Sequence, residues 1–182
     1  MKIPQITIHG RFQPPLHISH KNYIMDAFNL ADKVTILITN PNQDEGFVKE
    51  SSHRNDKENN PFTYKERVKI FSDYFTKINI PKERYEFKPF DIVDETNWSE
   101  TLDLLIPNLV NVYGEWSEEK VNKFKKNGYK VIRTDCPKEI PFSGKDIRKI
   151  LKKPISTEEK KKELLKVGYV PEALEGLFKV VE

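Results

Sequence analysis

The fold is decided by the stretch Ile6-Thr7-Ile8-His9-Gly10-Arg11-Phe12-Gln13-Pro14-Pro15-Leu16-His17-Ile18-Ser19-His20. A short β-like run breaks at Gly10 and at the two prolines, and a helical pattern follows. A strand, a tight turn and a helix N-terminus together form an anion site, because free backbone N–H groups and the positive end of the helix dipole point at one place. Arg11, His17 and His20 add side-chain donors, so the stretch predicts a polyphosphate site.

Length and composition bound the class of protein. The chain has 182 residues, 37% hydrophobic and 32% charged, which is typical of one soluble domain with a sizeable core. A net charge of +3 is too small to argue for a nucleic-acid or membrane partner. Cys136 is the only cysteine, so neither an intrachain disulfide nor a cysteine-based metal cluster is expected. The N-terminus carries no long apolar segment, and a cytoplasmic location is therefore expected.

Strand and helix patterns alternate along the chain. Strands are expected at 5–9, 34–39, 84–90, 109–113 and 129–133. Helices are expected at 18–30, 62–76, 98–106, 117–127 and 143–152. Such alternation with brief connections predicts an α/β fold with a doubly wound parallel sheet. Ligands of these sheets bind at the carboxyl ends of the strands, where residues 10–20 would lie.

Local signals mark the boundaries of several elements. Capping boxes or related caps are predicted by three pairs: Thr63 with Glu66, Asn97 with Glu100, and Ser143 with Asp146. Residues 40–61 are polar with almost no apolar content, which favours a functional lid or a disordered insertion. We expect residues 1–153 to form the α/β domain and residues 154–182 to add C-terminal helices packed on the same domain.

His17 and His20 stand three residues apart and share one face of the predicted helix. A lone histidine near a helix start is usually structural, but this pair stands beside Arg11 and the turn. Imidazole has a pKa near 6.5 and can donate to phosphate oxygens near neutral pH. Zinc binding is the competing use of paired histidines, yet no third ligand lies at a suggestive spacing, so no protein-held metal is predicted. For His9, at the end of the first strand, hydrogen bonding in the core is favoured over ligand binding.

A second cluster is Pro141-Phe142-Ser143-Gly144-Lys145-Asp146-Ile147-Arg148-Lys149-Ile150-Leu151. Its start, at Ser143, Gly144 and Lys145, is another helix N-terminus, and Arg148 follows one turn later. A guanidinium at that place can donate two parallel hydrogen bonds to phosphate oxygens. Alone, the segment would be interpreted as a solvated surface helix. Two anion cradles in one doubly wound domain instead predict a nucleoside triphosphate held from both sides.

Both clusters resemble known motifs. The patterns Gly-Arg-Phe-Gln-Pro-x-x-His-x-x-His at 10–20 and Ser-Gly-x-x-Ile-Arg at 143–148 resemble those of the nucleotidyltransferases related to class I aminoacyl-tRNA synthetases. Within that group, the chain looks most like the archaeal-type nicotinamide-nucleotide adenylyltransferases. The resemblance covers residues 5–151, supported by Asn-Pro-Phe-Thr-x-x-Glu-Arg at 60–67 and Asp-Ile-x-Asp-x-x-x-Trp at 91–98, with a weaker echo at 169–171.

The resemblance implies a Rossmann-like nucleotidyltransferase fold and the transfer of AMP from ATP, with Mg²⁺, to nicotinamide mononucleotide, giving NAD and pyrophosphate. It implies catalytic contacts from His17, His20, Arg11 and Arg148. Nucleotide contacts are expected from Gly10, Phe12, Gln13, Ser143, Gly144 and Lys145, although core packing is favoured for Phe12. The resemblance places Trp98, Asp91 and Asp94 at the nicotinamide site. A homo-oligomer is a further implication.

Three positions depart from the family pattern. Ser19 stands where the family usually has glycine, Lys145 where it has threonine or serine, and Glu95 where it often has asparagine. These differences motivate two alternatives. One is a cytidylyl- or adenylyltransferase acting on another phosphomonoester, and the other is a regulator that binds a nucleotide without turnover.

Overall fold

The computed structural model describes residues 2–39, 58–90, 111–114, 118–126, 128–133 and 144–181. Contacts divide the chain into two compact units. The first comprises Met1–Gly10, Asn22–Pro41 and Lys82–Cys136, and the second comprises Arg11–Lys21, Asn42–Pro81 and Pro137–Glu182. The predicted domain boundary at residue 153 stays a prediction.

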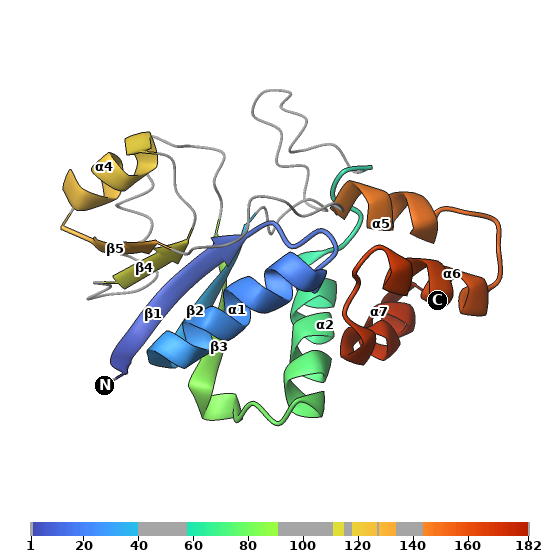
Figure 1. Cartoon of the computed structure of the whole chain (residues 1–182), viewed down its shortest axis with the longest axis horizontal. Helices are drawn as coiled ribbons and strands as arrows, with labels where there is room; N and C mark the ends of the chain where they lie inside the picture. Colours follow the sequence, from blue (N-terminus) through green and yellow to red (C-terminus); the bar gives the residue numbers. More distant parts are fainter. Residues whose placement is uncertain are drawn as a thin grey trace. The chain divides into compact units, whose positions relative to one another are not determined.

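The first unit contains a five-stranded sheet in the order β3-β2-β1-β4-β5, and every pairing is parallel (Figure 1). Its strands are β1 (Ile3–Gly10), β2 (Ala31–Thr39), β3 (Tyr85–Phe90), β4 (Asn111–Gly114) and β5 (Lys130–Arg133). This is the order 3-2-1-4-5 of a doubly wound sheet, which reverses direction between β1 and β4. The five predicted strands and the predicted α/β fold class are therefore confirmed.

The sequence of β2 fits its place inside the sheet. The strand is buried without interruption from Val34 to Thr39. A strand of a parallel sheet is typically covered on both faces, so its sequence is a near-continuous apolar and β-branched run rather than an alternating one. Val34-Thr35-Ile36-Leu37-Ile38-Thr39 has that character.

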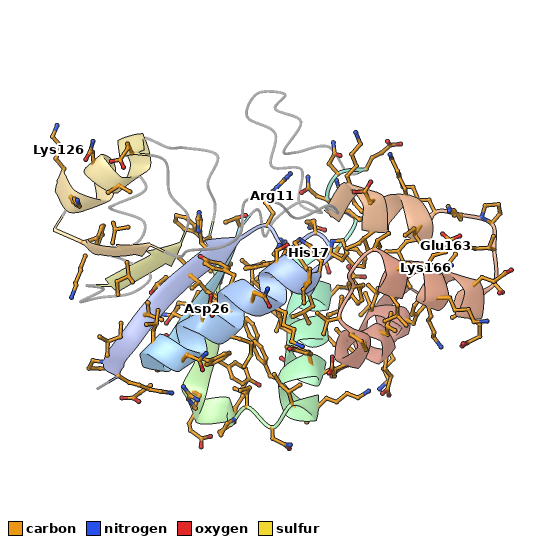
Figure 2. All side chains as sticks on the ribbon, viewed as in Figure 1. Arg11, His17, Asp26, Lys126, Glu163 and Lys166 are labelled. Carbon is orange, nitrogen blue, oxygen red and sulfur yellow. The ribbon has the colours of Figure 1, made fainter. Side chains whose placement is uncertain are left out.

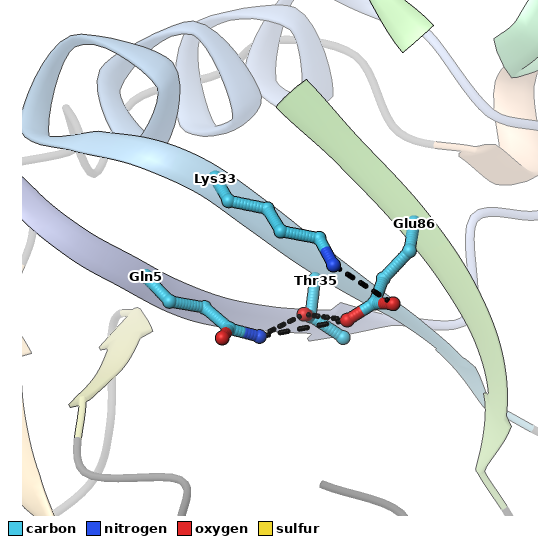
Figure 3. A network of polar contacts seen from close by, with 4 residues as sticks. All are labelled: Gln5, Lys33, Thr35 and Glu86. Atoms are coloured by element: carbon cyan, nitrogen blue, oxygen red, sulfur yellow. Dashed lines mark hydrogen bonds and ion pairs between the residues drawn. The ribbon is translucent and has the colours of Figure 1, made fainter. Parts of the chain in front are cut away.

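A polar network joins three neighbouring strands (Figure 3). Gln5 Nε2 donates to Thr35 Oγ1 at 2.8 Å, and the Thr35 hydroxyl donates to Glu86 Oε1 at 2.7 Å. Lys33 Nζ forms an ion pair with Glu86 Oε2 at 3.1 Å. Burial raises the pKa of the Glu86 carboxyl, but the hydrogen bonds from Thr35 and Lys33 and the Lys33 charge outweigh it and leave the pKa below its usual value.

Helix α1 (Ile18–Leu30) matches the predicted helix and buries Ile24, Ala27 and Phe28. Its last carbonyls need donors from outside the helix. Arg84, in the short 3-10 helix η2 (Lys82–Arg84), donates from Nη2 to the carbonyl of Phe28 in α1 and to that of Ala31, the first residue of β2, each at 2.8 Å. Helix α4 (Glu118–Lys126) confirms the helix predicted at 117–127, whereas the helix predicted at 98–106 lies outside the described residues.

The second unit is helical. It contains α2 (Tyr64–Lys77), α5 (Gly144–Leu151), α6 (Thr157–Lys166), the 3-10 helix η3 (Pro171–Ala173) and α7 (Leu174–Val181). Helix α2 packs against η3 and α7. The predicted capping box of Thr63 and Glu66 is present at the start of α2, and Ser156 with Glu159 forms a second one at α6 that the sequence analysis did not identify. The other two predicted caps involve residues outside the described part of the chain.

Candidate functional site

The loop that follows β1 has an unusual backbone. Phe12 has a φ of 51° and Leu16 a φ of 70°, and the Gln13–Pro14 peptide bond is cis. Residues with a Cβ seldom adopt the left-handed region, since the Cβ comes too close to the backbone. Contacts from elsewhere in the second unit must therefore maintain this conformation.

Helix α2 and the residues before it supply two of these contacts. Arg67 is fully buried, and its Nη1 donates to the carbonyl oxygen of Arg11 at 2.7 Å while its Nε donates to that of Thr63 at 3.2 Å. The Gln13 amide is held from both ends, because Nε2 donates to the Phe62 carbonyl at 2.7 Å and Oε1 accepts from the Phe62 N–H at 3.0 Å. Both sides of Phe12 are thus fixed.

The start of α5 touches the same loop. Arg148 Nη1 donates to the carbonyl oxygen of Gln13 at 2.6 Å. A Cβ on Gly144 would lie 2.7 Å from that oxygen, so only glycine allows this approach. The two anion cradles predicted from the sequence, one after β1 and one at the start of α5, are therefore in direct contact.

Positive charge gathers at this contact. Burial lowers the pKa of the Arg148 guanidinium, and the positive charge of Arg11 lowers it further, while Asp146 raises it. An anion bound beside Arg11 and Arg148 would relieve their mutual repulsion. Figure 2 marks Arg11, together with His17, on the segment that joins β1 to α1.

His17 and His20 form a stacked pair at the start of α1. Their ring centroids are 3.6 Å apart with an interplanar angle of 30°. Phe12 meets the His20 ring edge-on at 4.9 Å and packs against Phe71 of α2 at 5.0 Å. Phe12 is only 2% exposed. Its ring thus connects the histidine pair to the apolar core of the second unit, in keeping with the packing interpretation of Phe12.

Burial controls the charge of both imidazoles. It lowers the pKa of His17 to about 4. It also lowers the pKa of His20 well below the usual value, and repulsion from His17 adds to the effect. Both rings are consequently neutral at pH 7. Among the described residues, no group hydrogen-bonds Nδ1 of either ring or the Ser19 hydroxyl, although all three atoms are buried. Such atoms favour the arrival of a hydrogen-bonding ligand.

A C-terminal segment completes the surroundings of His17. The Ile18 N–H donates to the Gly168 carbonyl at 2.8 Å, and the Val170 N–H donates to the Leu16 carbonyl at 3.0 Å. His17 and Tyr169 consequently form an antiparallel bridge. No site role was predicted for this segment, of which only residues 169–171 carry a weak family resemblance.

Of the other predicted site residues, Gly10 and Lys145 are described by the structure and the rest are not. Gly10 ends β1, paired with Ile38, and Lys145 is exposed on α5. Ser143, Asp91, Asp94 and Trp98 belong to the undescribed residues, as does Glu95. Sequence reasoning missed the buried Arg67 and also Asn59, whose Oδ1 accepts from Arg148 Nη2 at 3.5 Å. A signal for Arg67 existed, since an arginine four residues after a helix N-cap can donate back to the cap carbonyl.

The described residues contain no group of three or more His, Cys, Asp or Glu side chains able to hold a metal ion. In the same part of the chain, no helix has both the length and the apolar character that crossing a membrane requires.

Known proteins resemble the chain in sequence and in fold. No protein-family model matches it. A phosphonoformate cytidylyltransferase of Streptomyces viridochromogenes is 29% identical over 149 residues, which is 78% of this chain and 77% of the relative. A bifunctional NMN adenylyltransferase/ADP ribose pyrophosphatase of Francisella tularensis, complexed with AMP and a manganese ion, has a TM-score of 0.60 at 18% identity over 97% of this chain and 52% of that one.

A third similar protein is the nicotinic acid mononucleotide adenylyltransferase of Plasmodium falciparum complexed with NaAD. Its TM-score is 0.50 at 17% identity, over 97% of this chain and 95% of that one. The chain spans about half the length of the bifunctional enzyme. At these identities the solved structures show the fold. The sequence relative and these structural neighbours are nucleotidyltransferases, and this chain shares the Rossmann-like α/β fold of the neighbours.

Proposed function

We propose that the protein transfers a nucleotidyl group from a nucleoside triphosphate to an acceptor that carries a phosphate, and in particular AMP from ATP to nicotinamide mononucleotide. The products would be NAD and pyrophosphate. One observation carries the proposal: Arg148 Nη1 lies 2.6 Å from the Gln13 carbonyl oxygen, which joins the two anion cradles of the second unit. A triphosphate is long enough to use both.

Each cradle has a role in this proposal. His17 and His20 contact the triphosphate, with His20 near the α-phosphate, while Arg11 holds the polyphosphate. Arg148 holds the β- and γ-phosphates that depart. The backbone around these side chains supports the nucleotide at Gly10, Phe12, Gln13, Ser143, Gly144 and Lys145.

The reaction is a substitution at phosphorus. An oxygen of the acceptor phosphate attacks the α-phosphorus, a new P–O bond forms, and the bond from the α-phosphorus to the bridging oxygen of the β-phosphate breaks as pyrophosphate leaves. The second pKa of the acceptor phosphate is about 6, so the nucleophile is already an anion at pH 7 and needs no general base. Alignment of two bound reactants supplies roughly 7–11 kcal/mol.

The divalent cation belongs to the substrate in this scheme. Mg²⁺ would enter with the triphosphate, coordinated mainly by phosphate oxygens and water, as this hard cation prefers. Neutral His17 and His20 would then act as N–H donors to phosphate, and the bound anion would raise the pKa of each ring. Nucleotide binding should therefore be accompanied by proton uptake below pH 7.

The choice of nicotinamide mononucleotide rests on the family resemblance of residues 91–98. In that assignment Trp98 stacks on the cationic nicotinamide ring, and Asp91 and Asp94 lie near its positive charge. A second candidate transfers CMP from CTP to a small phosphonate, or to a phosphomonoester other than nicotinamide mononucleotide. The 29% identity to a phosphonoformate cytidylyltransferase favours it.

A pyrophosphate-release assay separates the candidates. The full chain would be assayed with Mg²⁺ and each of ATP, CTP, GTP and UTP, against nicotinamide mononucleotide, nicotinic acid mononucleotide and phosphonoformate. The primary proposal expects the highest kcat/KM for ATP with nicotinamide mononucleotide. A preference for CTP with phosphonoformate would establish the second candidate. Calorimetric nucleotide binding without pyrophosphate release from any pair would instead indicate a regulator.

A substitution tests the role of His20, measured with the nucleotide and acceptor that prove to be substrates. His20→Ala should lower turnover by about 10²–10³, the usual cost of one well-placed donor to a developing charge. Lys162→Ala, at an exposed position of α6, is the matched control and should leave turnover unchanged. Turnover of His20→Ala within tenfold of wild type would remove this residue from the mechanism.

A further inference from the structure

We propose that Gly168–Val170, which we name the C-terminal bridge, is a positioning element that holds His17 and His20 toward the triphosphate. The inference rests on the proposed function, because it assigns a task within that same site. The C-terminal bridge pairs with Leu16-His17-Ile18, and its two hydrogen bonds, Ile18 N–H to Gly168 and Val170 N–H to Leu16, bracket His17 at 2.8 and 3.0 Å.

These two bonds satisfy groups that the local chain leaves open. Ile18 is the first residue of α1, and the N–H groups of a first helical turn have no partner inside their own helix. The Gly168 carbonyl supplies that partner. Leu16 itself has a left-handed backbone, with a φ of 70°, and its carbonyl accepts from the Val170 N–H. The direction in which α1 begins, and with it the direction of both imidazoles, therefore depends on the C-terminal bridge.

Packing makes the C-terminal bridge rigid. Leu16 is 0%, Tyr169 2% and Val170 1% exposed. Gly168 has a φ of +73°, and a Cβ there would stand 3.4 Å from Ile18 Cγ2. Glycine therefore provides the turn that brings the chain from α6 against the histidines. A loosely attached tail would show neither this burial nor this backbone geometry.

The C-terminal bridge also relates His17 to Arg148. Arg148 lies on α5 and is bonded to Gln13. Helix α5 packs against α6, and Lys153, two residues after α5 ends, forms an ion pair with Glu163 Oε2 of α6 at 2.7 Å. Helix α6 then leads into Gly168. Residues 144–170 thus reach the loop after β1 at two points, one at the arginine and one at the histidines. Arg148 and the histidine pair, which are assigned to opposite ends of the triphosphate, are therefore both held by the segment 144–170.

Proline substitutions can remove each hydrogen bond singly. Val170 has φ −71° and ψ 122°, which suit both proline itself and a residue that precedes Pro171. Val170→Pro deletes only the donor to Leu16, apart from a small loss of side chain, and Val170→Ala keeps the donor. Ile18→Pro deletes the donor to Gly168 at a first helical position, where proline is well tolerated, and Ile18→Ala is its control.

Both proline variants should lower kcat/KM for the triphosphate at least about tenfold relative to their alanine controls. NMR titration measures the pKa of His17 directly, and a merely less stable but still folded protein would leave that pKa unchanged. In the proline variants the His17 imidazole should titrate closer to the ordinary pKa of 6.5 than in the alanine variants, because its burial is relaxed.

The outcomes are distinct. Proline and alanine variants with equal kcat/KM and equal histidine titration would overturn the positioning role. If Val170→Pro does not fold, Ile18→Pro decides the question with the same two measurements. If the wild-type chain transfers no nucleotidyl group, the proposed function fails, whereas the titration of His17 still shows whether the C-terminal bridge sets its environment.

Discussion

Arg148 Nη1 donates to the carbonyl oxygen of Gln13 at 2.6 Å, across 135 positions of sequence. The guanidinium therefore has two tasks in the proposed site. One of its donors fixes the loop after β1 and a second reaches Asn59 Oδ1 at 3.5 Å, while its other N–H groups and its charge can serve an anion. Arginine can do both because its donors are held in a planar fork, which a lysine lacks.

Arg148→Lys should lower turnover by about 10²-fold, because an ammonium cannot hold the Gln13 carbonyl and a phosphate in the same geometry. Steady-state kinetics with the active substrate pair measures the effect. Lys149→Ala on the same helix is exposed and serves as the control. A kcat within threefold of wild type for Arg148→Lys would contradict the dual role.

Gly144→Ala should destabilise the protein and raise KM for the triphosphate. The new Cβ would stand 2.7 Å from the Gln13 carbonyl oxygen and 3.3 Å from Arg148 Nη1, so the loop or α5 must move. Crowding of this kind costs about 1–3 kcal/mol. Urea unfolding gives the free-energy change, and Lys149→Ala again provides a reference. Unchanged stability together with unchanged KM would mean that the close approach is unimportant.

Acid should destabilise the protein through His17. The pKa of His17 is about 4 in the folded protein and near 6.5 when unfolded, so the unfolded chain binds this proton first as pH falls. The contribution of neutral His17 to the free energy of unfolding is fully present above pH 6.5 and is lost as pH falls from 6.5 toward 4. Urea midpoints measured between pH 7 and pH 4.5 should decline less in His17→Gln. Parallel profiles for the two proteins would show that His17 is not protected by burial.

Arg67→Met should cost about 1–3 kcal/mol, since it leaves the Arg11 carbonyl without its charged donor in a buried place, while the Thr63 carbonyl keeps the backbone N–H of residue 67. Arg67→Lys should recover part of that loss by restoring one donor. Chemical unfolding measures both variants. Lys65→Met, at an exposed position of the same helix, controls for the change in side-chain type. A loss no larger than that of Lys65→Met would show that the Arg11 carbonyl finds another partner.

Local patterns in the sequence predicted the elements well. The five strands, the helix at 18–30 and the capping box of Thr63 and Glu66 depend on hydrophobic periodicity and on side chains three residues apart, and all are present. Two helix N-termini in one domain predicted a triphosphate held from both sides; the structure places Arg148 against Gln13, and the ligand stays a prediction. The roles of the individual site residues stay predictions.

Long-range contacts that lack a periodic signature could not be predicted. The place of Arg67 after the N-cap accounts for its bond to Thr63, but nothing local predicts that the side chain is buried and donates to the Arg11 carbonyl. Nothing in the side chains of Gly168 and Val170 predicts that their backbones pair with those of Ile18 and Leu16. Backbone-to-backbone bonds are almost independent of side-chain identity, so such pairing leaves little trace in composition.

The network of Gln5, Thr35 and Glu86 also constrains where β1 ends. Side chains alternate between the two faces of a strand, so sliding β1 by one residue past β2 would turn Gln5 away from Thr35 and break the chain of bonds to Glu86. The same slip would shift the exit of β1 by about 3.3 Å. These three polar side chains therefore fix the register of β1 against β2, and with it the position at which β1 ends and the chain continues to Arg11.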